Sequence, residues 1–259
     1  MRGGSCKGTD FLISHFFVSL RLLSPCPFVA GSCRFPNFCS FLRTEAFVFI
    51  KFPYLYRAFE EYDDMEKEKI TFAPCVMVID AVALDGVVGN MRRYFSAILR
   101  RELPLANLAM LLEYLVLDAG CKPDAARQVQ VILVYESGKE RLTACEPSDF
   151  RTELHGQAFQ GTMGEFSIGA YQPSGMTTRE ALFTETLQLL AESKEAEQWI
   201  LVPDLDEYGR EWRKALKEKK EKVNCMLFGM ENPGTPEGVA YEQLGYAVLR
   251  ALGVRADEF

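Results

Sequence analysis

Two aspartates separated by one residue, Asp204 and Asp206, follow directly after the apolar run 199–202. A third acid, Asp80, stands near the end of another apolar run, 75–83. Carboxylate oxygens are the ligands that Mg²⁺ and Mn²⁺ prefer, and a bound cation offsets the repulsion between clustered acids. Because ligands of open α/β sheets bind at the carboxyl ends of the parallel strands, we expect these three aspartates to lie together and to hold such an ion.

Each of these acids also suits a structural role. Asp80 would accept hydrogen bonds from backbone N–H groups near it, and Asp204 would serve as a helix N-cap or a turn residue. Asp206 suits the start of a helix, where a negative charge meets the positive end of the helix dipole. The metal-site prediction therefore depends on the three acids occurring together, and not on any one of them.

The elements that must position these acids alternate between apolar runs and helical patterns from Thr71 onward. This alternation is typical of a parallel sheet with crossover helices. We predict strands over 75–83, 129–135, 166–171, 199–202 and 223–228. We predict helices near 88–101, 105–119, 148–154, 179–194 and 207–222, and a closing helix that is capped at Thr235 and ends at about Leu252. The sequence thus predicts an α/β, three-layer Rossmann-like domain over 71–259, with a mostly parallel five-stranded sheet.

The N-terminal part of the chain differs from this domain in composition. Residues 1–52 hold ten of the 19 Phe and four of the eight Cys, with six basic and two acidic residues. Their net charge is +4, which leaves −11 for 53–259. We expect 1–70 to be an irregular or disordered segment. Three interpretations stay open: sequence upstream of a true initiator at Met65 or Met77, a secretory or lipoprotein signal, or a genuine N-terminal domain.

The composition of the globular part argues against several classes of function. An acidic domain has no general attraction for phosphate backbones. Its best candidate for a basic stripe consists of four arginines: Arg92, Arg93, Arg100 and Arg101. A solvated helix face explains these arginines as well. Its cysteines are isolated and the chain has two His, so the usual zinc-ligand spacing is missing. These features are typical of a reduced, cytoplasmic protein, and no membrane association is expected of this part.

The layout of the acids resembles PIN-like domains, and within them the NYN type. In those proteins an early strand ends in an aspartate, and a late strand leads into a Ser-Gly-Asp-x-Asp-like turn. Asp80 matches the first feature, and the second is written here Val202-Pro203-Asp204-Leu205-Asp206. The similarity covers about 75–230. The chain as a whole also resembles a bacterial family of unknown function.

The resemblance implies a metal-dependent ribonuclease. In the active relatives, clustered acids hold magnesium or manganese and activate water for phosphodiester cleavage, so single-stranded RNA is the implied partner. A further acid usually begins the helix before the late strand, and Glu180, or less closely Glu185, occupies that region here. The implied catalytic set is therefore Asp80, Glu180, Asp204 and Asp206, with the three aspartates as metal ligands.

Two other functions fit the same residues. A catalytically degenerate PIN-like module would bind a protein partner or support a homo-oligomer, in keeping with the acidic charge and with Pro203 in place of the usual Ser or Gly. Tyr208, Trp212 and Tyr241 would then mark its surface, unless they pack between helices. An Asp-x-Asp motif after an apolar strand also occurs in glycosyltransferases, where it binds a metal and a nucleotide sugar. No glycine-rich phosphate loop accompanies it here.

Overall fold

A central sheet organises the part of the chain that the computed structural model describes, residues 71–220 and 222–258. Among these residues seven strands form the sheet in the order β5-β6-β3-β1-β7-β8-β9. All neighbours pair in parallel except β5, which is antiparallel to β6. The strands are β1 (Cys75–Asp80), β3 (Gln128–Val134), β5 (Gln157–Gln160), β6 (Glu165–Tyr171), β7 (Gln198–Val202), β8 (Asn224–Gly229) and β9 (Val239–Gln243).

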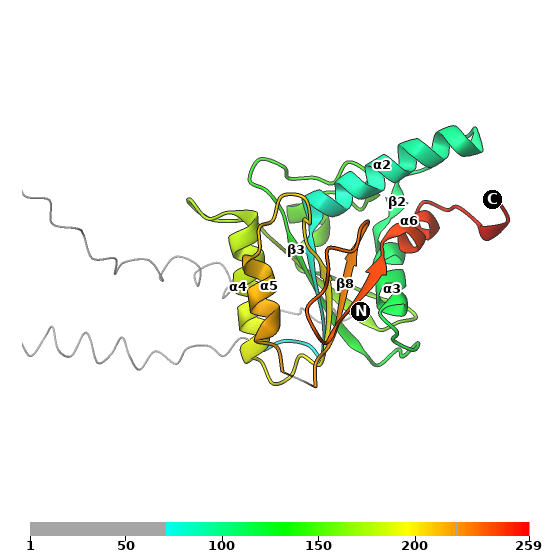
Figure 1. Cartoon of the computed structure of the whole chain (residues 1–259). Coiled ribbons are helices and arrows are strands. Elements are labelled where there is room, and N and C mark those ends of the chain that lie inside the picture. The colour runs from blue at the N-terminus through cyan, green and yellow to red at the C-terminus, as the bar shows by residue number, and fades with distance from the viewer. Residues whose placement is uncertain (1–70, 221, 259) are drawn as a thin grey trace, which may run out of the picture. The chain divides into compact units, whose positions relative to one another are not determined.

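Two layers of helices cover the faces of this sheet (Figure 1). Helices α4 (Arg179–Glu192) and α5 (Glu211–Lys217) pack on one face. Helices α2 (Ala81–Leu99), α3 (Leu108–Asp118) and α6 (Gly245–Ala251) pack on the other. Because both faces are covered, every residue of β1 is buried, which accounts for its continuous apolar sequence.

The predicted α/β class and the five parallel strands are confirmed, but the sheet has seven strands and not five. The two additional strands, β5 and β9, lie at its edges. An edge strand is covered on fewer sides and needs no continuous apolar run, and β5 is largely exposed. The prediction of a closing helix from Thr235 was wrong for the residues of β9, and the helix that is present, α6, begins only after this strand.

Helix boundaries also differ from the predicted ones. Helix α2 begins at Ala81, earlier than predicted, because Asp80 ends β1 and caps the helix at once. Helix α5 covers only the middle of the predicted 207–222 helix. The predicted short helix near 148–154 is present as a π-helical turn, η2 (Phe150–Leu154).

The remaining described elements are small. A two-stranded sheet joins β2 (Ala106–Asn107) to β4 (Cys145–Glu146), and a 3₁₀ turn, η3 (Ala256–Glu258), lies near the C-terminus. The predictions for residues 1–70 lie outside the described residues. No helix within 71–220 or 222–258 is both long enough and apolar enough to cross a membrane.

Asp85 ties α2 to the loop that leads into β4. Its carboxylate accepts hydrogen bonds from the backbone N–H and hydroxyl of Thr143, at 2.9 and 2.6 Å, and from Ala144 N at 2.8 Å. We expect Asp85→Ala to lower the free energy of unfolding by about 1–3 kcal/mol, because buried Ala144 N–H loses its acceptor. Urea unfolding measures this change. The control is Glu185→Ala, at an exposed position, whose free energy of unfolding should stay within about 0.5 kcal/mol of that of the wild type. Equal stability of both variants would contradict the prediction.

Candidate functional site

The order of the strands places a crevice at the carboxyl ends of β1 and β7. The chain passes from β1 to β3 and β6 on one side and then returns to β7 on the other side of β1. In open parallel sheets such a reversal of direction leaves room for ligands outside the strand ends. Asp80 is the last residue of β1, and Asp204 follows β7 by two residues. The topology therefore brings these two acids to one place.

Asp80 is fully buried, and its carboxylate is saturated with hydrogen-bond donors. One oxygen accepts from Val82 N and Ala83 N, at 2.9 and 2.8 Å, so that Asp80 is the N-cap of α2. Arg179 Nη1 donates to both oxygens, at 2.7 and 2.6 Å, and the Tyr208 hydroxyl donates to the second oxygen. Burial raises the pKa of Asp80, against the hydrogen bonds from Tyr208 and Ala83 and the charge of Arg179.

Arg179 is the centre of the cluster. Its Nη2 lies 3.5 Å from Asp204 Oδ2 and also contacts Glu207 Oε2. Its guanidinium carbon lies 6.0 Å from the centre of the Tyr208 ring. Burial disfavours the charged form, but the negative charges, that of Asp80 above all, outweigh this and raise the pKa of Arg179. One positive charge is therefore shared among three carboxylates.

Residues 204–208 form a turn that carries Tyr208 into the cluster. Asp204 is buried, and its Oδ1 accepts from the N–H groups of Asp206 and Glu207, at 3.2 and 3.0 Å. Its carbonyl accepts from Tyr208 N at 3.0 Å. Burial, together with the charge of Asp80, raises the pKa of the Tyr208 hydroxyl, which therefore keeps its proton and donates. Asp204 therefore has the role of a turn residue, which was the structural alternative to metal binding.

The other two predicted site residues lie differently. Asp206 is exposed, and its part in the turn is its backbone N–H. Glu180 points toward the turn between β7 and α5: a methyl group at Gly209 would lie 3.2 Å from Glu180 Oε1. This oxygen is buried and has no hydrogen-bond partner among the described residues. The structure thus brings Asp80 and Asp204 together and leaves the side chain of Asp206 out of their hydrogen bonds.

Sequence analysis missed Arg179 and the role of Tyr208. Arg179 is the first residue of α4, after Thr178, which caps the helix by accepting from Ala181 N at 3.1 Å. A positive charge at a helix N-terminus is unfavourable. That placement is a signal in the sequence that a carboxylate lies nearby. Tyr208 and Trp212 are buried, so the helix-packing interpretation is confirmed for both.

The cluster does not fit a divalent cation in this arrangement. Both Asp80 oxygens are occupied by donors, and a guanidinium stands where Asp80, Asp204 and Glu207 converge. Within 71–220 and 222–258, no group of three or more His, Cys, Asp or Glu side chains has the arrangement of a metal site. The arginine supplies the positive charge that a metal would supply.

A family model described as "Family of unknown function (DUF6621)" matches residues 69–259. The chain belongs to this family. The match covers every described element of this DUF6621 protein, from β1 to η3. No curated protein and no solved structure matches the chain significantly.

Proposed function

We propose that this DUF6621 protein is a PIN-like module of the NYN type that performs no metal chemistry and binds a protein partner. The relation to PIN-like domains is supported by the five parallel strands in the order β6-β3-β1-β7-β8 and by the acids at the carboxyl ends of β1 and β7. The protein-binding role is the interpretation that the acidic composition and the occupied cluster favour.

The observation that carries the proposal is the position of Arg179. A nuclease of this type needs carboxylate oxygens that are free to bind a metal, which then activates water. Here the guanidinium pairs with Asp80 and Asp204, and its side chain is only 11% exposed. A cation entering the crevice would meet a fixed positive charge and would have to displace Arg179 Nη1, which donates to both Asp80 oxygens.

The distribution of positive charge also supports a role other than RNA cleavage. The arginines of the predicted basic stripe lie in the second half of α2, a helix of 19 residues, and just beyond its end, so that Arg100 is about 30 Å from Asp80 along the helix axis. Arg92 donates to the carbonyl of Leu103, at 2.7 Å, and Arg101 pairs with Glu258, at 2.8 Å. Arg92 and Arg101 therefore form contacts within the domain.

A metal titration and an RNA assay test the proposal together. Calorimetry with Mn²⁺ on the full chain is expected to give no saturable heat, with the same result for Asp204→Asn. Labelled single-stranded RNA incubated with the protein and Mn²⁺ is expected to stay intact. A stoichiometric Mn²⁺ heat that Asp204→Asn abolishes, together with cleavage that Asp80→Asn abolishes, would instead establish a nuclease.

A further inference from the structure

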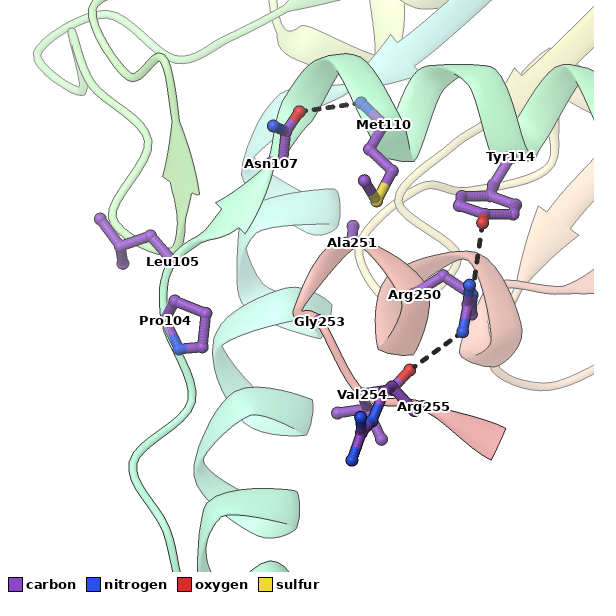
Figure 2. A pocket seen from close by; sticks show the side chains of 10 residues that line it. All are labelled: Pro104, Leu105, Asn107, Met110, Tyr114, Arg250, Ala251, Gly253, Val254 and Arg255. Atoms are coloured by element: carbon purple, nitrogen blue, oxygen red, sulfur yellow. Dashed lines mark hydrogen bonds between the residues drawn. The ribbon is translucent and has the colours of Figure 1, made fainter. Parts of the chain in front are cut away.

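A groove at the surface of α3 and α6 lies apart from the Arg179 cluster (Figure 2). It has a volume of about 310 Å³, at the lower limit of ligand pockets in proteins. Pro104 and Leu105 lie along one side of it, and α6 and Val254 along the other. Met110 of α3 reaches into the space between them. None of these residues takes part in the cluster at the carboxyl ends of the strands.

The surface beside this groove is apolar and exposed. The side chain of Met110 is 41% exposed, and Tyr114 and Leu117 follow it on the same face of α3. Tyr246 of α6, 57% exposed, packs edge-on against Tyr114 with ring centres 6.0 Å apart. Large apolar side chains from two neighbouring helices thus form a continuous surface, which is typical of a protein-binding site.

The charge of the groove is opposite to that of the domain. Residues 71–259 contain 28 acidic and 20 basic residues, a net charge of −8. The ten residues that line the groove nevertheless include two arginines, Arg250 and Arg255, and no acid. An occupant with negative charge is therefore favoured here and disfavoured over most of the remaining surface.

Arg250 is held in place to meet such an occupant. Its Nε donates to the Tyr114 hydroxyl at 3.3 Å and its Nη1 to the Val254 carbonyl at 3.5 Å (Figure 2). Its guanidinium carbon lies 5.7 Å from the centre of the Tyr114 ring. Arg255 pairs with Asp257, at 3.4 Å, and both side chains are more than 70% exposed. Such an exposed pair contributes little and is readily exchanged for another carboxylate.

We propose that this groove binds a short segment of a partner protein that carries apolar side chains next to acidic ones. The apolar side chains contact Met110, Leu105 and Val254, and the carboxylates pair with Arg250 and Arg255, whose planar groups bind carboxylates through two hydrogen bonds. A nucleic acid fits less well, because its affinity depends on many phosphate contacts, and the domain around the groove is acidic. The inference rests on the proposed protein-binding function and names the site and the partner's chemistry.

Fluorescence polarisation tests the inference with the full chain and a fluorescein-labelled twelve-residue peptide of alternating leucine and glutamate. We expect saturable binding by the wild type and at least tenfold weaker binding by Arg255→Gln and by Met110→Ser. Lys214→Gln, which changes an exposed base on α5, is the matched control and should bind as the wild type does. A peptide with lysine in place of glutamate should not bind.

Several outcomes would overturn the inference. They are absence of binding, equal binding of the lysine peptide, unchanged binding by both groove variants, and complete displacement of the peptide by unlabelled single-stranded RNA. Concentration-dependent dimerisation in sedimentation that Met110→Ser abolishes would assign this surface to a second copy of the chain. Failure of the proposed function is seen separately, as Mn²⁺ binding and RNA cleavage, and neither requires the groove.

Discussion

Arg179→Ala is expected to lower the free energy of unfolding by about 3–5 kcal/mol, the usual cost of removing one partner of a buried ion pair. Asp80 is fully buried, and the variant would leave its carboxyl group without a cation beside it. Arg179→Lys retains the charge but not the second terminal nitrogen: Nη1 contacts both Asp80 oxygens, and Nη2 contacts Asp204 and Glu207. We therefore expect an intermediate loss. Chemical denaturation in urea measures each value.

A matched control separates this effect from the loss of any surface charge. Lys214 forms an exposed ion pair with Glu211, with both side chains about two-thirds exposed. Lys214→Ala should therefore change stability by less than about 0.5 kcal/mol. If Arg179→Ala were as stable as Lys214→Ala, the guanidinium would not be the charge that compensates Asp80.

The destabilisation by Arg179→Ala should depend on pH in a defined direction. Burial raises the pKa of Asp80, and the charge of Arg179 is one of the effects that oppose the rise, so the variant raises this pKa further. A carboxyl group whose pKa is raised by folding stabilises the folded state fully at a pH below its pKa in the unfolded chain, about 3.9. This stabilisation is lost as the pH rises through the pKa of the group in the folded protein. The difference between wild type and variant is therefore expected to be larger at pH 7 than at about pH 4.5. A pH-independent difference would contradict this.

The parallel core of the fold was predictable from sequence because burial on both faces leaves a clear pattern. All residues of β1 are buried, as are the last four of β7, and each strand appears in the sequence as an apolar run. Strand β9 has a single buried residue, Val239, and follows a segment whose Thr-Pro-Glu sequence suits a helix start. Local sequence therefore favoured a helix, and only pairing with β8 makes β9 a strand.

Within the candidate site, only the residues at the ends of strands could be predicted from the sequence. Asp80 ends β1 and Asp204 follows β7, and these strands are parallel neighbours, so the convergence of the two acids follows from topology. Arg179 is 99 residues from Asp80 and 25 from Asp204 along the chain, and the packing of α4 alone brings it to both. Clustered acids in a sequence indicate that a positive charge is needed nearby. They do not indicate whether a metal or a side chain of the same chain supplies it.

Manganese is expected to stabilise Arg179→Ala and to leave the wild type unchanged. Without the guanidinium, Asp80, Asp204 and Glu207 would face one another with no cation between them, and a hard divalent ion would offset their repulsion. Metal–oxygen distances of about 2.1 Å are shorter than the 2.6 and 3.5 Å that separate Arg179 from the two aspartates. The carboxylates must therefore move inward, which costs affinity. A Mn²⁺ concentration one hundred times the Kd would stabilise the variant by about 2.7 kcal/mol.

The double variant Arg179→Ala/Asp204→Asn is the control for this result, because it removes both the guanidinium and one of the carboxylates that it contacts. In thermal unfolding, Mn²⁺ should raise the Tm of Arg179→Ala and should not raise the Tm of the wild type or of the double variant. An equal rise in wild type, single and double variants would indicate binding elsewhere on an acidic surface. No rise in any of them would show that Asp80, Asp204 and Glu207 converge without creating a cation position, and that Arg179 does not stand in for a metal.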